Sequence, residues 1–324
     1  MILINRDVGG HDAHTAMLLG AAKLLKPYAS TLAAEGKVVR FAFQPSEEGG
    51  AGGKMMMEQG LLDGASAAFA LHTSSRDEVG KIVAKAGVLS AATSSWTLTI
   101  KGKGGHAARP YMTKDPVNAA AQIVLSLNTI VGRMVDNPND PVIIGVSTIH
   151  GGDASNIVPE KVVITGTIRA STYEVLLSMK QIVKDRSIDI AAANGCNATV
   201  LYRDDEKYVN SRGEAYQKAS YPPNINDPSL YHLGMHTAVE LFKKEDGTSK
   251  VDDLIHEAPN RGLGGEDFSF FREKVPTAFF RIGHASDEKT ATSHHNPKFQ
   301  MDESMLHRGA ALYAMLALDY LASV

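Results

Sequence analysis

The sequence contains very little cysteine and tryptophan and no long apolar run, and each shortage excludes a class of protein. Of its 324 residues, one is a cysteine, Cys196, and one is a tryptophan. A single thiol excludes a disulfide framework and a zinc cluster held by several cysteines. No stretch approaches the roughly 18 consecutive apolar residues that a membrane-spanning helix needs. We therefore expect no membrane partner and no cysteine-based metal site.

The charge is nearly balanced, which excludes two further classes. The chain has 33 lysines and arginines against 36 aspartates and glutamates, a net charge of -3, and 44% of its residues are hydrophobic. This composition argues against intrinsic disorder and against a basic surface for nucleic acid. The opening residues, MILINRDVGGHD, lack the basic segment and apolar run of a secretory signal, so we expect a cytoplasmic protein by default.

The two ends of the chain alternate helices and strands in a way that is typical of an α/β domain with a doubly wound, mostly parallel sheet. Hydrophobic periodicity separates the helices from the strands. The predicted strands are residues 38–44, 67–71 and 277–282, and the predicted helices are residues 14–25, 54–60 and 306–321.

The middle of the chain has a different pattern, in the order strand, helix, strand, strand, helix, strand. This order is the ferredoxin-like arrangement, which closes on itself as a small α+β domain. The predicted elements are residues 95–101, 115–135, 141–150, 161–169, 172–194 and 198–203. Residues 204–228 are polar and read as a return linker. We therefore predict a discontinuous catalytic domain, residues 1–90 and 204–324, with an inserted lid or dimerisation domain, residues 91–203.

Twelve histidines stand against the single thiol, so a metal would be held by nitrogen and oxygen. Metal-ligand chemistry occurs at four places where an α/β sheet keeps its sites: His11, the pair Glu47-Glu48, His72, and the pair His294-His295. Taken singly, a histidine at a helix start can be a cap, a glutamate pair can be solvated surface, and a strand histidine can belong to the core. Taken together they predict a metal site, where one glutamate binds metal and its neighbour holds the proton of the attacking water.

Long motifs in the chain resemble those of a known family. GGHDAHTAMLLGAAKLL resembles the signature CGHDAHTAMLLGAA of metal-dependent amidohydrolases, which include aminoacylases, hippurate hydrolases and IAA-amino acid hydrolases. FAFQPSEEGGAGGK, AFALH, GKGGHAARP, TIHGGDASNIVPEKVVITGTIRA, GGEDFSFF and HHNPKF continue the resemblance in the same order. It extends from His11 to the end of the chain.

The resemblance implies a set of metal ligands and one catalytic acid/base. Glu47 would be the acid/base, and His295 is preferred over His294 because the family histidine stands two positions before a proline, here Pro297. Two divalent ions, zinc or manganese, would be bound per chain of a complete relative. The implied ligands are His11, Glu48, His72 and His295.

The resemblance also assigns roles in the lid and a reaction. His106 would reach a substrate oxygen, in many relatives from the partner subunit, and Asn156 and Arg169 match positions associated with substrate binding. For Asn156 and Arg169, packing and strand-end hydrogen bonds are an equal alternative. The implied reaction is hydrolysis of the amide bond of a small N-acyl or N-conjugated amino acid, by a homodimer formed through the lid.

Two departures from the family pattern lead us to expect impaired activity. The family has a metal-bridging cysteine two residues before His11, where this chain has Gly9, which offers no donor atom. An opening run of strands that precedes the histidine motif in relatives is also missing, so we expect an N-terminally truncated member with exposed apolar surface and unpaired strand edges. The alternative is a catalytically inactive fragment or paralogue that acts as a dimerising binding or regulatory subunit.

Overall fold

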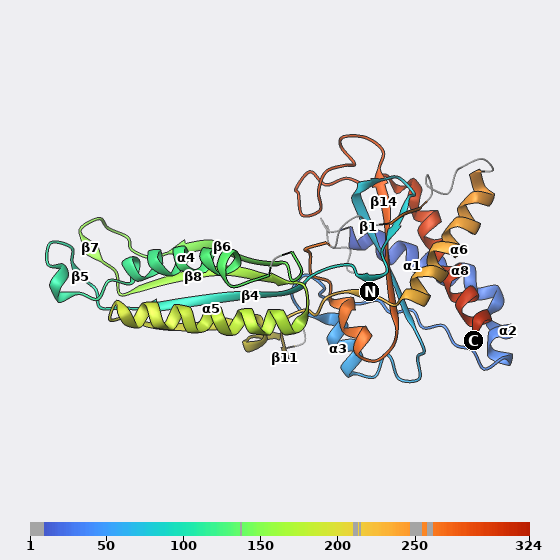
Figure 1. The fold of residues 1–324 in the computed structure, drawn as a ribbon. Coiled ribbons are helices and arrows are strands. Elements are labelled where there is room, and N and C mark those ends of the chain that lie inside the picture. Colours follow the sequence, from blue (N-terminus) through green and yellow to red (C-terminus); the bar gives the residue numbers. More distant parts are fainter. Residues whose placement is uncertain (1–9, 137, 210–212, 214, 247–254, 258–261) are drawn as a thin grey trace.

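The computed structural model describes residues 10–136, 138–209, 213, 215–246, 255–257 and 262–324. The chain forms a rounded main body and an elongated insertion that extends from one side of it (Figure 1). None of the described helices is long and apolar enough to cross a membrane.

In the described part of the chain, the main body is built around a four-stranded mixed sheet in the order β1-β14-β2-β13. The β1–β14 and β2–β13 pairs are parallel, and β14 and β2 are antiparallel. Seven of the nine residues of β14 are buried, as expected for a strand covered on both faces. The strands are β1 Ala68–Glu78, β2 Ile82–Ala84, β13 Ile255–Glu257 and β14 Thr277–Ala285.

Helices cover both faces of this sheet, which confirms the predicted α/β fold. On one face α1, α6 and α8 bury a core around Met17, Phe242 and Phe280. On the other face α3 and the short helix η4 (Asp267–Glu273) pack around Phe271 and Phe279. The α-helices are α1 His11–Leu25, α2 Ala29–Ala34, α3 Gly52–Glu58, α6 Pro228–Asp246 and α8 Leu306–Ser323, and the other short helices are η1 Lys26–Tyr28 and η5 Glu303–Met305.

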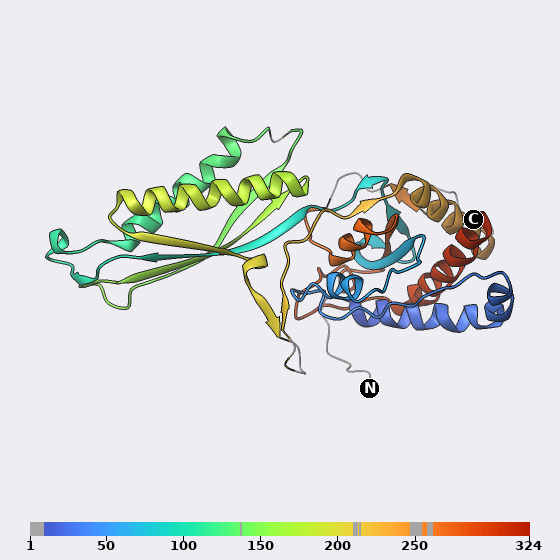
Figure 2. The same ribbon diagram turned by 90° about the horizontal axis from the view of Figure 1, so that it is seen from below.

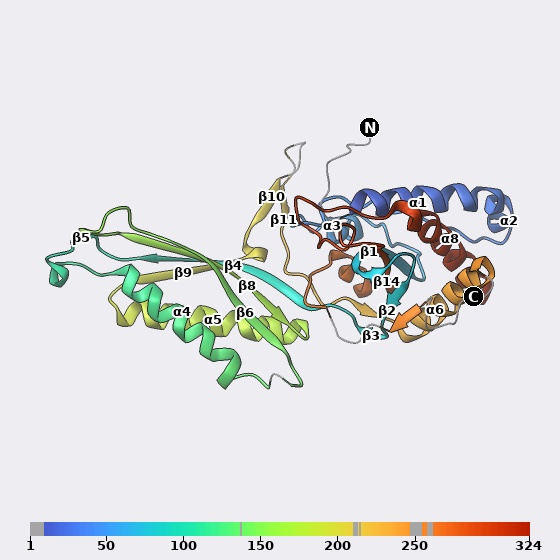
Figure 3. The same cartoon turned by 90° about the horizontal axis from the view of Figure 1, so that it is seen from above.

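The insertion has the predicted ferredoxin-like order. Its antiparallel sheet runs β6-β8-β4-β9, and α4 and α5 lie on the same face of that sheet (Figures 2 and 3). Trp96, Ile123 and Ile164 are among the buried side chains between helices and sheet. The elements are β4 Ala92–Lys101, β5 Gly105–His106, η2 Pro110–Met112, α4 Pro116–Arg133, β6 Val142–His150, β7 Ile157–Val158, β8 Lys161–Ala170, α5 Tyr173–Ala193 and β9 Asn197–Tyr202.

The strand predicted at residues 38–44 is wrong, because the structure assigns no strand there. In the described residues, β1 pairs with β14 alone, and a cavity of about 800 Å³ is lined by both β1 and the 38–44 segment. An apolar run becomes a strand only when a neighbour accepts its main-chain hydrogen bonds. Without one, Val38 is 73% exposed and Phe43 is 46% exposed.

Two smaller expectations are also corrected. His72 lies inside β1, because the strand continues past it to Glu78. The predicted linker at 204–228 contains η3 (Arg203–Asp205), a hairpin, and β12 (Ile225–Asn226), which pairs with β3 (Gly87–Val88). The hairpin strands, β10 Lys207–Val209 and β11 Ala215–Gln217, project from the junction between main body and insertion (Figures 2 and 3).

Candidate metal centre

The site begins where α1 starts against β1. Gly10 precedes the helix with φ of 81°, a left-handed conformation that suits glycine. A Cβ atom at this position would lie 2.6 Å from Thr73 Oγ1, so only a residue without a side chain allows this approach. The close contact brings the first turn of α1 beside the middle of β1.

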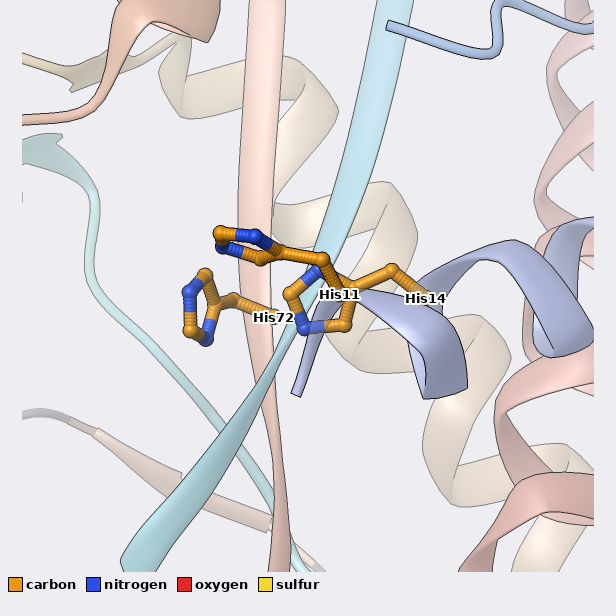
Figure 4. A group of neighbouring side chains, drawn as sticks. All are labelled: His11, His14 and His72. Carbon is orange, nitrogen blue, oxygen red and sulfur yellow. The ribbon is translucent and has the colours of Figure 1, made fainter. Parts of the chain in front are cut away.

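This contact gathers three imidazole rings, shown in Figure 4. His11 and His14 stand three residues apart on α1 and therefore share a helix face, and His72 comes from β1. The ring centroids of His14 and His72 are 4.4 Å apart, those of His11 and His14 are 5.2 Å apart, and those of His11 and His72 are 5.8 Å apart.

The carboxylate pair lies in a turn that faces these rings. Glu47 Oε2 is 3.9 Å from His11 Nε2, and Glu48 Oε1 is 3.1 Å from His295 Nε2. A cavity of about 370 Å³ is lined by both glutamates and by His72 and His295. The structure thus brings together five residues that the sequence selects: His11, Glu47, Glu48, His72 and His295.

The hydrogen bonds of His72 and His14 show which ring nitrogen of each histidine contacts the protein. His72 Nδ1 lies 2.7 Å from the main-chain oxygen of Thr73, which can only accept, so Nδ1 donates and Nε2 keeps its lone pair. A backbone partner of this kind orients a metal-binding imidazole. His14 differs, because its Nε2 accepts a hydrogen bond from Thr73 N at 3.0 Å.

Burial keeps His14, His72 and His294 neutral. It lowers the pKa of His72 to about 3 and that of His294 to about 4, and it holds the pKa of His14 well below its usual range. Neighbouring imidazoles add to the effect on all three rings. A neutral imidazole is the form that binds metal.

The carboxyl groups of the site lie close enough to repel one another, and the positive charge nearby does not fully offset this repulsion. Burial, together with the charges of Glu266, Asp267 and Glu48, raises the pKa of Glu47 to about 9. The pKa values of Glu266 and Asp267 are also raised, mainly by burial. Arg203 acts in the opposite direction on Glu47 and Asp267. A cation beside these groups would relieve their mutual repulsion.

The geometry allows more than one set of metal ligands. Each set offers ligand atoms within 4.8 Å of one another. The sets are His11 with His14 and His72, His11 with Glu47 and Glu48, and Glu47 with Glu266 and Asp267. Oxygen and nitrogen donors of this kind suit zinc and manganese alike.

The insertion contributes Arg169 to the same cavity. Arg169 of β8 lines the same cavity as the glutamates, and its Nη1 donates to the main-chain oxygen of Leu263 at 3.3 Å. Burial, followed by the charge of Arg203, lowers the pKa of Arg169. The cavity is therefore lined by carboxylates and imidazoles of the main body and by the guanidinium of Arg169 from the insertion.

The structure does not bring His106 and Asn156 to this cavity. Both lie at the distal tip of the insertion, where β5 pairs with β7 and Ala107 N donates to Asn156 O at 2.9 Å. Figure 1 shows β5 and β7 at the end of the insertion farthest from the main body. The candidate residues therefore form a proximal group around Glu47 and a distal group at this tip.

Sequence reasoning missed several residues of the site. His294 lies within 3.2 Å of Thr73 Oγ1 and its ring is 5.3 Å from that of His72, so both members of the histidine pair are at the site. Arg203 and Tyr221 also line the cavity. No local motif marks these two residues, because only the packing of the junction brings them beside Glu47. Gly9 lies outside the described residues.

Comparisons with known proteins show the family of the chain. Residues 8–319 match the family described as peptidase family M20/M25/M40. The chain is 36% identical to IAA-amino acid hydrolase ILR1-like 4 of Arabidopsis thaliana, over 96% of this chain and 66% of that protein. It is 35% identical to N-acetyl-L-cysteine deacetylase of Bacillus subtilis, over 92% of this chain and 63% of that protein.

A solved structure shows the same fold. It is a dinuclear metal-binding peptidase of the M20 family from Bacillus subtilis, with a TM-score of 0.72 and 28% identity, covering 98% of this chain and 74% of that one. The chain belongs to peptidase family M20/M25/M40. It spans about two thirds of the length of the curated relatives that it matches.

Proposed function

We propose that this chain carries the metal centre of an amidohydrolase that cleaves the amide bond of N-acyl or N-conjugated amino acids. The observation that carries the proposal is the convergence of imidazoles, among them the neutral ring of His72, and crowded carboxylates on a cavity that Arg169 also lines. The relatives named as an IAA-amino acid hydrolase and an N-acetylcysteine deacetylase support this substrate class.

The donor set fits divalent metal. His11, Glu48, His72 and His295 are the proposed ligands, and two ions of zinc or manganese are the proposed complement, in agreement with the dinuclear relative. When bound, such ions polarise a carbonyl and lower the pKa of a bound water. The main-chain contact that orients His72 supports its assignment as a ligand.

Glu47 is the proposed acid/base, since its carboxyl group lines the cavity and lies 3.9 Å from His11 Nε2. Burial raises its pKa to about 9, and a bound cation would favour the ionised form that takes a proton from water and returns it to the leaving amine. Arg169 can bind the carboxylate of the amino acid with its planar guanidinium. Its place on the insertion side of the cavity would keep the scissile amide on the Glu47 side.

A second copy of the chain is proposed to complete the site. His106 would stabilise the oxyanion and Asn156 would contact substrate, yet both lie at the distal tip of the insertion. Residues 91–203 are the proposed lid and dimerisation domain, and residues 1–90 and 204–324 the catalytic domain. In a homodimer formed through the lids, the distal tip of one copy would reach the proximal group of the other.

We also propose that the chain is less active than a family member that has the cysteine at the position of Gly9. Gly9 has no donor atom for the metal pair, so one anionic ligand would be replaced by water. An inactive binding or regulatory subunit remains the competing function, favoured by this same residue.

The test is amine release from N-acetyl and indole-3-acetyl amino acids in the presence of zinc or manganese. The proposal predicts slow turnover by the chain. Glu47→Gln should lower it by about 10²- to 10⁴-fold while the protein retains its metal, since a general base contributes about that much. Metal binding without any turnover would favour the binding subunit, and turnover unaffected by Glu47→Gln would contradict the assignment of Glu47.

A further inference from the structure

The hydroxyl group of Tyr221 makes three hydrogen bonds at the junction between the main body and the insertion. It donates to the main-chain oxygen of Glu47 at 2.7 Å, and it accepts from Arg203 Nη2 at 2.7 Å and from Ala51 N at 3.3 Å. A phenol has one donor and two lone pairs, so this set exhausts its hydrogen-bonding capacity. Tyr221 is only 3% exposed, so water contributes little to this arrangement.

Arg203 is held on the tyrosine by a second interaction. Its guanidinium carbon lies 4.2 Å from the centroid of the Tyr221 ring, a cation–π contact. The planar guanidinium can stack on the ring and donate to its hydroxyl at once, which a lysine ammonium cannot do in the same geometry. The two side chains therefore form one unit, which we call the Arg203–Tyr221 clamp.

The turn that the clamp contacts needs support from outside. Ser46 and Ala51 flank the Glu47–Glu48 pair with φ of 56° and 55°, and both are left-handed residues other than glycine. Such conformations persist when surrounding contacts fix them. Within the turn, Gly50 N donates to Ser46 O at 2.9 Å. The clamp adds contacts at two further points of the turn, Glu47 O and Ala51 N.

The clamp also lies where the chain passes between the two units. Thr93, near the start of β4, and Tyr221 exchange main-chain hydrogen bonds of 2.9 Å and 2.8 Å. Arg203 directly follows β9, the last strand of the insertion. The incoming and outgoing connections thus meet at the residues that hold the Glu47 turn.

A polar network extends this junction into the insertion. Ser220 Oγ donates to Asp204 Oδ1 at 2.6 Å, and Lys180 of α5 pairs with Asp204 Oδ2 at 2.5 Å. Asp204 and Ser220 are the chain neighbours of the two clamp residues. A displacement of the insertion would therefore be transmitted to the clamp through side chains as well as through the backbone.

From this geometry we infer that Arg203 and Tyr221 are positioning residues, which fix the Glu47 turn and make its orientation depend on the position of the insertion. The inference rests on the proposed function for the role of Glu47 as acid/base. The clamp itself contacts the main chain of the turn and takes no part in the chemical step.

Tyr221→Phe tests the inference, because it removes the hydroxyl and keeps the ring on which Arg203 stacks. Hydrogen exchange at the amides of residues 48–51 should become about fivefold faster or more, the factor expected for one lost hydrogen bond. The kcat should fall about 10- to 100-fold, since displacements of about 1 Å have effects of this size. The KM should change by less than about threefold, because the substrate carboxylate site is untouched.

Tyr202→Phe is the matched control. Tyr202 is also a buried tyrosine, and its hydroxyl donates to a main-chain oxygen, that of Lys180 in the insertion. This variant should lose similar stability, with unchanged exchange at residues 48–51 and unchanged kcat. Arg203→Lys should retain more activity than Arg203→Gln.

The two readouts separate the possible failures. If the Tyr221→Phe and Tyr202→Phe variants have the same hydrogen exchange at residues 48–51 and the same kcat, the inference that the clamp fixes the Glu47 turn is wrong. If the parent chain hydrolyses no substrate, that result counts against the proposed function, and the exchange measurement alone decides whether the clamp holds the turn.

Discussion

Glu47 is buried beside other carboxyl groups, and this has a consequence for stability in the metal-free chain. Burial, and then the neighbouring carboxylates, raise the pKa of Glu47 far above the 4.5 of a free glutamate. A carboxyl whose pKa is raised on folding destabilises the folded state as the pH rises from its unfolded pKa through its folded pKa. His72 and His294 have the opposite shift, because burial lowers their pKa values, and their titration changes the free energy of unfolding only below about pH 6.5.

Between about pH 7 and about pH 8.5, the carboxyl groups should therefore dominate this pH dependence. The free energy of unfolding of the metal-free chain should fall by about 1–2 kcal/mol across this interval, since each pKa unit corresponds to about 1.4 kcal/mol. Urea unfolding at a series of pH values measures it. Zinc or manganese should flatten the profile, as should Glu47→Gln, whereas a rising profile in the metal-free chain would contradict the crowding of these carboxyls.

The sequence and the structure agree best where the residues are carried by long local motifs. His11, Glu47, Glu48 and His295 stand in contiguous strings, so they can be selected without knowing the fold. Arg203 and Tyr221 could not be selected in this way. They are 18 positions apart and meet because two chain connections cross at the junction.

Among the elements, the contact of α1 with β1 determines where the histidines lie. Gly10 has a left-handed backbone, and a Cβ on it would lie 2.6 Å from Thr73 Oγ1. Gly36 has a similar φ of 69°, but a Cβ on it would have no atom within 4 Å. A side chain at Gly36 would therefore strain only the backbone, whereas a side chain at Gly10 would strain the backbone and also clash with β1.

Gly10→Ala should destabilise the chain by about 2–4 kcal/mol, and Gly36→Ala by about 1 kcal/mol. The larger loss in the Gly10 variant is due to the displacement of α1 from β1. The same displacement should weaken metal binding in the Gly10 variant and not in the Gly36 variant. Urea unfolding and a metal titration of both variants provide the comparison. Equal losses in the two variants would show that the contact with Thr73 does not position the helix.

Periodicity predicted the elements of the insertion within a few residues because each one completes its pairing inside the unit. Asp115 accepts from Val117 N at the start of α4, and Thr172 accepts from Val175 N at the start of α5, so both helix starts are set locally. Residues 38–44 have an equally apolar pattern and no strand. An apolar run forms a strand only when a neighbouring strand can pair with it, and the local sequence pattern does not show whether such a strand is present.

For the whole molecule, the separation of the distal group from the proximal group is the decisive feature. A single chain holds Glu47 at the junction and His106 at the far tip. If a homodimer combines them, each copy completes the site of the other, and two differently disabled copies can form one intact site.

Mixing His106→Ala with Glu47→Gln under conditions that exchange subunits should therefore restore turnover to about a quarter of the parent value. Half of the randomly mixed dimers contain one copy of each, and each such dimer has one intact site of two. Amine release measures the recovery. The control is each variant mixed with itself, and activity no higher than in these controls would contradict the exchange of His106 between copies.

A titration of the metal-free chain with zinc or manganese in a calorimeter tests the assignment of the metal centre most directly. About two ions should bind per chain, and Glu48→Gln should remove at least one of them, because Glu48 and His295 lie together on the cavity. Glu47→Gln should leave the stoichiometry unchanged. Failure of the parent chain to bind ions, or binding that is indifferent to Glu48→Gln, would contradict a metal centre built from these residues.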